Sequence, residues 1–224
     1  MRDLLPETLL SLIRDRYLAG VADAEAAFDQ SSADEDAVTG ALGQSIALRE
    51  PLIFSDGRQA YQLSINYKKL RGRGNAAPEK RLGSDGIFQI SVTTATGKIV
   101  RRKGLPFQAK SRWQSIDKRL VEQARVMQST AQGGIVVDYG PTGYFCSPIE
   151  AVIEVGGSRR KLEKVGGLKR LGQTLANEFL DCKIGQQGLY YDPETEEFIV
   201  EADGYRNYEH LLTTSVEVRP RAEV

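Results

Sequence analysis

The sequence predicts an α/β sandwich in which helices flank a mixed central β-sheet. Two segments with helical spacing of apolar residues come first, β-type segments with alternating or continuous apolar residues follow, and further helices interrupt the strands in the second half. This order of elements is typical of a layered α/β domain. The 224 residues suit one domain, or one domain with a smaller appendage.

The N-terminal part is expected to be helical. Residues 6–28 predict one helix, or two short ones with Gly20 as the break. Their apolar residues recur at helical spacing, namely Leu9, Leu10, Ile13, Tyr17 and Val21. A second helix is expected to begin with Ser32 as its N-cap and Glu35 three residues later, the spacing of a capping box. Pro51 ends it.

Strands follow. Residues 61–67 alternate between apolar and polar side chains, and residues 87–94 form the next strand, joined by a turn at 95–98 to a return strand from residue 99. Pro106 is expected to introduce a strand that carries Gln108 and Lys110.

The later elements are less regular. A helix is expected through Ile116, Leu120, Ala124 and Met127, then a buried strand at 135–139, strands at 144–147 and 151–155, and an amphipathic helix at 167–180. We divide the chain into a core of residues 1–140 and an α/β extension of the same domain, residues 141–224. The extension is a possible interface for a second copy or a partner.

The formal net charge of zero hides a strong asymmetry. Residues 1–65 carry 5 Lys and Arg against 11 Asp and Glu, residues 66–125 carry 15 against 4, and residues 126–224 carry 10 against 15. A cluster of cations attracts phosphate polymers even in a neutral protein. Solvated hairpins are the alternative interpretation. The candidate nucleic-acid contacts are Lys68, Lys69, Arg71, Arg73, Arg101, Arg102, Lys103 and Arg112.

Three residues of the basic segment form a candidate catalytic set. Asp85 precedes the strand 87–94, and Gln108 and Lys110 lie two residues apart on the next strand, so their side chains share one face. If the two strands pair, Asp85 reaches the same side. The set then offers two oxygen ligands for a hard divalent cation and one ammonium group.

The motif Gly83-Ser84-Asp85-Gly86-Ile87, followed by Gln108-Ala109-Lys110 and flanked by helices, resembles the restriction-endonuclease-like superfamily, the PD-(D/E)xK nucleases. The closest likeness is to Mrr-like and bacterial defence nucleases in which Gln replaces the second acid. The resemblance covers roughly residues 30–140.

The resemblance implies a site that binds Mg²⁺ or Mn²⁺. Asp85 would be the main metal ligand, Gln108 and the backbone carbonyl of Ala109 would complete the set, and Lys110 would act on the attacking water or the transition state. Glu35 matches an acid that some members place on the preceding helix. Its competing role is the capping box with Ser32. Asp36 and Glu79 are alternative acids.

Other chemistries have less support. Cys146 and His210 are the one conceivable thiol–imidazole pair, and two cysteines with one histidine do not predict a structural zinc site. Trp113 could stack on a base, although packing is its ordinary role, and Gln123 is expected on the surface.

The resemblance implies a Mg²⁺-dependent endonuclease that hydrolyses double-stranded DNA in bacterial anti-phage defence. The alternative is a catalytically inactive nucleic-acid-binding or assembly subunit of a defence complex. Activation by a homo-oligomer or a partner protein is expected. The N-terminus does not resemble a signal peptide, no apolar stretch suits a membrane span, and the cysteines suggest reduced thiols, so we expect a cytoplasmic location.

Overall fold

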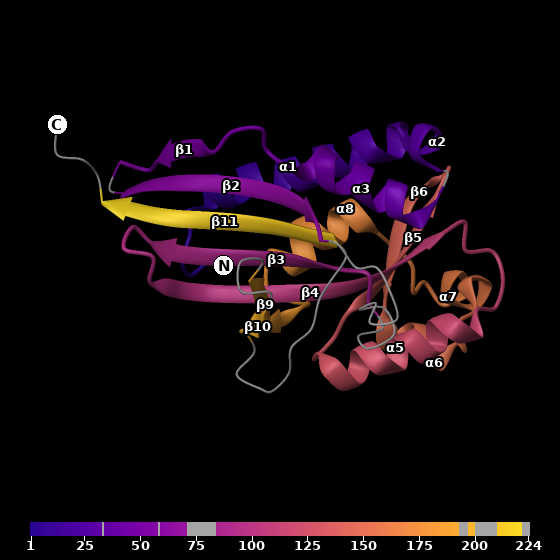
Figure 1. Cartoon of the computed structure of the whole chain (residues 1–224). Coiled ribbons are helices and arrows are strands. Elements are labelled where there is room, and N and C mark those ends of the chain that lie inside the picture. The colour runs from indigo at the N-terminus through magenta and orange to yellow at the C-terminus, as the bar shows by residue number, and fades with distance from the viewer. Residues whose placement is uncertain (33, 58, 71–83, 193–196, 200–209, 221–224) are drawn as a thin grey trace.

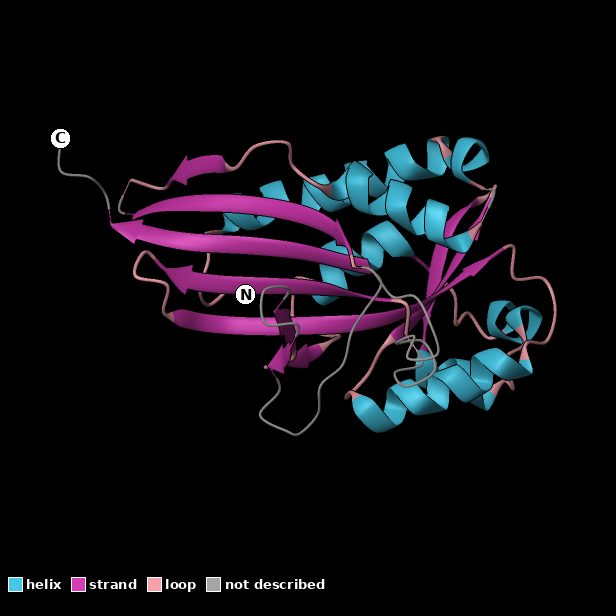
Figure 2. Cartoon of the chain, in the orientation of Figure 1, coloured by secondary structure: helices cyan, strands magenta, loops and turns pink. Residues whose placement is uncertain are grey.

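A mixed β-sheet forms the centre of the molecule in the computed structural model (Figures 1 and 2), which describes residues 1–32, 34–57, 59–70, 84–192, 197–199 and 210–220. In this part of the chain the strands follow the order β1-β2-β11-β3-β4-β5-β6-β7, and β8 pairs with β4. Their bounds are β1 Leu52–Ser55, β2 Gln59–Lys69, β3 Gly86–Thr94, β4 Ile99–Ser111, β5 Ile135–Gly140, β6 Gly143–Pro148, β7 Lys169–Arg170, β8 Gln186–Gln187 and β11 His210–Pro220. In a separate two-stranded sheet, β9 (Tyr190–Asp192) pairs antiparallel with β10 (Glu197–Ile199). The fold is thus α/β with a mixed central sheet flanked by helices.

Helices cover both faces of this sheet. Their bounds are α1 Glu7–Ala26, α2 Phe28–Ser31, α3 Glu35–Ile46, α5 Lys118–Thr130, α6 Ile149–Glu154, α7 Arg159–Lys164, α8 Leu171–Gln173 and the π-helix η1 Thr174–Phe179. The largest core packs α1, α3 and η1 against one face of the sheet, where Phe107 and Ala109 of β4 are buried. On the other face, α5 and α6 pack against Val136 of β5, and Ile87 of β3 packs against Tyr191 of β9 and the preceding Leu189.

The strand β11 places the C-terminal part of the chain inside the sheet. It pairs antiparallel with β2 and parallel with β3, with His210 opposite both Lys69 and Gly86. Residues 141–224 therefore contribute a central strand as well as β6, β7 and the elements beside them. Figure 1 shows β11 between β2 and β3.

The N-terminal helices differ from the sequence prediction in two details. The helix α1 continues through Gly20, which packs against the backbone of Ile46 on α3 rather than breaking the helix. The N-cap of α3 is Asp34, whose side chain accepts from the N–H of Ala37 at 2.6 Å, so the predicted capping box of Ser32 and Glu35 is wrong. Asp is as good an N-cap as Ser, and this cap leaves the Glu35 carboxylate available for another contact.

Two strand predictions also change. Residues 151–155 do not form a strand, because α6 occupies Ile149–Glu154 and buries Ile149 and Val152 against α5. Pro106 does not begin a new strand. It lies inside β4, which runs from Ile99 to Ser111 and pairs with β3 from Ile99 to Phe107.

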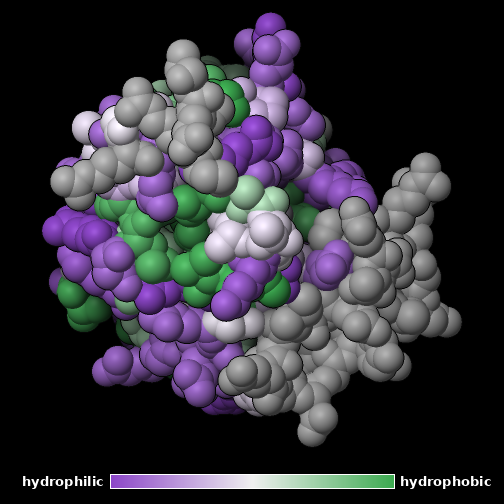
Figure 3. Space-filling view, turned by 90° about the vertical axis from the view of Figure 1, so that its left-hand side faces the viewer, coloured by the Kyte–Doolittle hydropathy of each residue, from purple (hydrophilic) through white to green (hydrophobic). Residues whose placement is uncertain are grey.

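The two ends of the long strands have different surfaces. Viewed from the end where β3 turns into β4, hydrophobic residues gather around a hollow with hydrophilic residues about it (Figure 3). Ile99 and Val100 at the start of β4 are 46% and 44% exposed. None of the described helices is long and apolar enough to cross a membrane.

Candidate active site

The candidate site lies where β4 extends beyond the start of β3. The first residue of β3, Gly86, pairs with Phe107, and β4 continues for four more residues to Ser111. The N–H of Asp85 still bonds the carbonyl of Phe107 at 2.9 Å. Beyond that point, side chains rather than a strand contact this edge of β4, as the next hydrogen bonds show.

Two carboxylates bind successive N–H groups along this edge. Oδ2 of Asp85 accepts from the N–H of Ala109 at 2.7 Å, and Oε2 of Glu35 accepts from the N–H of Ser111 at 2.8 Å. Alternate residues of a strand direct their N–H and C=O groups to the same side. The carbonyl of Ala109 therefore faces the same edge, between the two carboxylates, whose N–H partners are about 7 Å apart along the strand.

Gln108 connects Asp85 to this carbonyl. Its Nε2 donates to Oδ2 of Asp85 at 2.6 Å and lies 3.4 Å from the carbonyl oxygen of Ala109. The side chain is 2% exposed, and its Oε1 is buried with no hydrogen-bond partner among the described residues. A buried amide oxygen without a donor loses free energy unless it finds a ligand. The sequence predicted this juxtaposition of Asp85 and Gln108.

Lys110 follows Gln108 by two residues on β4 and contacts the start of α5. Gln108 pairs in register with Val136, which packs under α5, so Gln108 and Lys110 face the α5 side of the sheet. The Lys110 ammonium lies 3.4 Å from Oδ2 of Asp117, and its side chain is 17% exposed. Asp117 is also the N-cap of α5 and accepts from the N–H of Leu120 at 2.9 Å. The start of α5 thus positions the lysine.

The surroundings of Asp85 are rigid. The N–H of His210 donates to its carbonyl at 3.1 Å, and a Cβ at the next residue, Gly86, would lie 2.6 Å from the carbonyl oxygen of His210 and 2.5 Å from the ring of Phe107. Three elements therefore meet at this point with no room for another side chain. The carboxylate of Asp85, whose residue is 7% exposed, is held where the three elements meet.

Two buried side chains near Asp85 and Glu35, those of Tyr139 and His210, are treated as neutral. Burial raises the pKa of Tyr139, and the negative charges of Asp85 and Glu35 raise it further, while Thr39 donates to its hydroxyl at 3.3 Å. His210 lies 2.9 Å from both the hydroxyl of Tyr67 and Oδ1 of Asp36. Burial lowers the pKa of His210 to about 4, so we treat it as neutral near pH 7 although Asp36 favours its charged form.

The donors at this edge fit a hard divalent cation. No group of three His, Cys, Asp or Glu side chains suitable for a metal occurs in the described part of the chain. The edge instead offers two carboxylates and a backbone carbonyl, oxygen ligands of the kind that Mg²⁺ and Mn²⁺ prefer, whereas Gln108 turns its amide nitrogen toward Asp85 and this carbonyl. The buried Oε1 of Gln108, which lacks a donor, is the specific observation that favours a ligand here.

The predicted basic contacts separate into two groups. Near the site, Lys68, Lys69 and Arg112 are exposed, and Lys69 binds Asp36. Arg101, Arg102 and Lys103 lie toward the other end of β4, with Lys103 about 23 Å from Lys110 along the strand. Arg71, Arg73 and Glu79 are outside the described residues.

The prediction that Lys103 contacts phosphate is wrong. The residue is fully buried, its Nζ donates to the carbonyl of Phe179, and the ammonium lies 4.2 Å from the ring centroid of the same residue. Arg101 pairs with Asp3 at 2.8 Å, and Arg102 stacks 4.1 Å from the ring centroid of Tyr190. The predicted basic segment is therefore not one continuous surface.

The remaining candidates have structural roles. Cys146 lies 3.3 Å from the hydroxyl of Thr174, and burial raises the pKa of its thiol to about 11, whereas His210 contacts Tyr67 and Asp36. These two residues do not form a pair. Trp113 is buried in the core under α5. Gln123 is 9% exposed, so the prediction of a surface glutamine is wrong.

One pair beside the site was not predicted. Asp138 of β5 stands in register with Lys110 and is 4% exposed. It accepts from Nε of Arg159 at 2.6 Å and from the N–H of Trp113 at 3.2 Å. Burial raises the pKa of Asp138, although the Arg159 guanidinium opposes this effect. An acid inside an apolar strand was the available signal, but the register and the partner from α7 could not be read from the sequence.

Comparison with known proteins adds no family to this description: no protein-family model, no curated protein and no solved structure matches the chain.

Proposed function

We propose that the protein is a Mg²⁺-dependent endonuclease with a restriction-endonuclease-like fold and site, and that it hydrolyses phosphodiester bonds in DNA. The observation that carries the proposal is the pair of carboxylates, from Asp85 and Glu35, on either side of the carbonyl of Ala109. Glu35 comes from a helix and Asp85 from the start of a strand, so distant segments converge on one oxygen-rich edge with Lys110 beside it.

Each residue has a role that follows from its contacts. Asp85, Glu35 and the carbonyl of Ala109 would hold the cation, and Gln108 would join them through Oε1 only after its amide turns, because Nε2 faces Asp85 in the structure. The cation when bound supplies a Lewis acid that polarises a phosphoryl oxygen. Because Lys110 lies beside the carboxylate of Asp117, we assign its ammonium to stabilising negative charge on the phosphate rather than to removing a proton.

The test is cleavage of supercoiled plasmid by the purified protein with Mg²⁺, with Mn²⁺ and with EDTA. We expect cutting that requires the metal and is lost in Lys110→Ala. Lys118→Ala is the matched control, because Lys118 is an exposed lysine at the start of α5, close in sequence to the site but without a site contact. Equal cleavage by wild type and Lys110→Ala would contradict the proposed site.

A second function is favoured by one contact. Nε2 of Gln108 donates to Oδ2 of Asp85 at 2.6 Å, and a neutral amide binds Mg²⁺ less strongly than a second carboxylate would. If this contact between Gln108 and Asp85 persists when Mg²⁺ is present, the protein would be a nucleic-acid-binding or assembly subunit without catalysis. Salt-sensitive DNA binding with no cleavage under any of the three conditions would favour this alternative. The role in anti-phage defence stays a prediction from the resemblance.

A further inference from the structure

A groove of about 620 Å³ opens next to the candidate site. Its walls come from the segment after β4, the turn between β5 and β6, and the helix α7, and the lining includes Arg112, Trp113, Asp138, Thr142, Arg159 and Arg160. Arg112 follows Lys110 by two residues, and Asp138 stands opposite Lys110 in the sheet. The groove therefore continues from the site across β5.

Two of its three guanidinium groups, those of Arg112 and Arg160, form no ion pair with a described residue, although the Arg112 guanidinium lies 6.0 Å from the ring centroid of Phe28. Arg159 is held by Asp138 at 2.6 Å and by Glu163 at 3.3 Å. Arg112 and Arg160 are exposed, and neither forms an ion pair with a described residue. The polar contact of the Arg112 side chain is a long one, 3.4 Å from Nη2 to the hydroxyl of Ser32.

The wall that carries Arg112 is fixed. Its N–H bonds the carbonyl of Tyr139 at 2.8 Å, and its φ of 55° is a left-handed conformation that residues with a side chain rarely adopt. Trp113 is anchored behind it through Asp138 and through the carbonyl of Ser115 at 3.0 Å. Arg112 is therefore presented from a rigid support, and ordering it on a ligand costs little backbone entropy.

We propose that this groove binds the phosphate backbone of the nucleic acid on one side of the phosphodiester to be cut, with Arg112 and Arg160 as its phosphate contacts. The proposal rests on the proposed function, because the groove is assigned to DNA only if the neighbouring site hydrolyses DNA. Guanidinium groups bind phosphate oxygens with two parallel hydrogen bonds. Two exposed carboxylates in the groove, those of Asp29 and Glu163, oppose this binding, although Glu163 lies 3.3 Å from the Arg159 guanidinium.

The groove can be tested without catalysis, by fluorescence anisotropy of a labelled DNA duplex in EDTA over a range of salt concentrations. We expect Arg112→Glu and Arg160→Glu each to weaken binding about tenfold or more and to reduce the salt dependence by about one to two released counterions. Asp29→Asn should strengthen binding. Arg112→Gly removes the charge but suits the left-handed backbone, so it keeps the test valid if Arg112→Glu folds poorly.

Arg125→Glu is the control, because Arg125 is an exposed arginine of α5 outside the groove. If the Arg112 and Arg160 variants bind the duplex with the same affinity as Arg125→Glu, the proposal that the groove binds DNA is wrong, even if the wild type cleaves plasmid. Groove-dependent binding without cleavage in Mg²⁺ or Mn²⁺ would instead overturn the proposed function and support a binding role for the groove.

Discussion

The two ends of β4 carry similar charges but use them differently. At its start, Arg101 pairs with Asp3, Arg102 stacks on Tyr190, and Lys103 is buried. At its end, Ala109 and Ser111 offer N–H groups to two carboxylates. At the first end the three cations contact an acid, a ring or a backbone carbonyl of the fold, whereas at the second end two carboxylates converge on an edge that no described strand covers.

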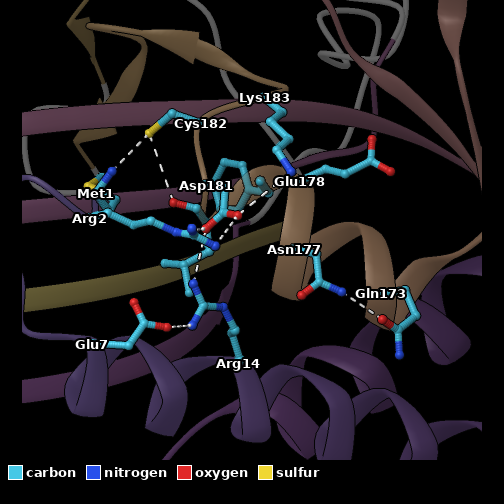
Figure 4. Close-up of polar contacts among 12 residues, drawn as sticks. Met1, Arg2, Glu7, Arg14, Gln173, Asn177, Glu178, Asp181, Cys182 and Lys183 are labelled. Atoms are coloured by element: carbon cyan, nitrogen blue, oxygen red, sulfur yellow. Dashed lines mark hydrogen bonds and ion pairs between the residues drawn. The ribbon is translucent and has the colours of Figure 1, made fainter.

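Residues far away in the sequence cause this difference. Lys103 is buried because η1 ends above it, and next to η1 Asp181 binds both Arg2 and Arg14 (Figure 4). Burial of Asp181 opposes its charge, but hydrogen bonds from Arg14 and Arg2 lower the pKa of its carboxyl group. A run of basic residues therefore indicates a binding surface only where the fold does not supply partners.

The largest expected effect comes from Asp85. Replacing Asp85 by Asn should lower the rate of metal-dependent plasmid cleavage at least about 100-fold, because a ligand contributes more than the residues that orient it. Asp3→Asn is the matched change at the other end of β4 and should leave cleavage unchanged. A similar loss in both variants would show that the two ends do not differ as described.

Lys103 tests the start of β4, where we assign structural roles to the basic residues. Lys103→Glu should lower the free energy of unfolding by about 3 to 5 kcal/mol, because it places an unpaired charge in the core beside a carbonyl and a ring. Lys103→Met has a similar shape without the charge, and burial already lowers the pKa of this lysine, so its stability should stay within about 1 kcal/mol of wild type. Denaturant unfolding measures both. A stable Lys103→Glu would mean that this end is open to solvent.

Gly86 links stability to the site. Gly86→Ala should cost about 1 to 3 kcal/mol and reduce cleavage, since its Cβ would press on the carbonyl of His210 and shift Asp85. Gly97, in the turn at the other end of β3, has open space around it and a φ of 78°, so Gly97→Ala should cost backbone strain but leave cleavage intact. Loss of cleavage in Gly97→Ala alone would contradict this assignment.

The smallest expected effect is on pH dependence. The pKa of His210 is about 4 in the folded protein against an ordinary value of 6.5, so the unfolded chain binds the proton first as pH falls. Its contribution is therefore complete above pH 6.5 and is lost progressively as the pH falls from 6.5 to 4. Thermal unfolding of wild type and His210→Gln over this range measures it. Parallel profiles for the two proteins would show that His210 does not titrate as expected.

The sequence predicted contacts between residues that are close in the chain better than contacts between residues that are far apart in the chain. The pairing of the strands beginning at Gly86 and ending at Ser111 follows from one short turn, and it brings Asp85 to Gln108 as expected. The contact of Glu35 with Ser111 was obscured by the spacing of a capping box, because Asp34 and Ser32 are equally good caps.

The features that the sequence did not predict depend on contacts between residues far apart in the chain. The central position of β11, between β2 and β3, depends on contacts across more than 100 residues and leaves no local signal. The same applies to Lys103, whose partner Phe179 is 76 residues away, and to Arg159 beside Asp138. Activation through a homo-oligomer or a partner protein stays a prediction.

The most direct test of the central claim is binding of Mn²⁺, followed by electron paramagnetic resonance, to wild type, Asp85→Asn, Glu35→Gln and Asp3→Asn. We predict one site that is lost in Asp85→Asn, weakened in Glu35→Gln and unchanged in Asp3→Asn. Mn²⁺ affinity that is the same in wild type and Asp85→Asn, or no binding by the wild type at millimolar metal, would contradict the account.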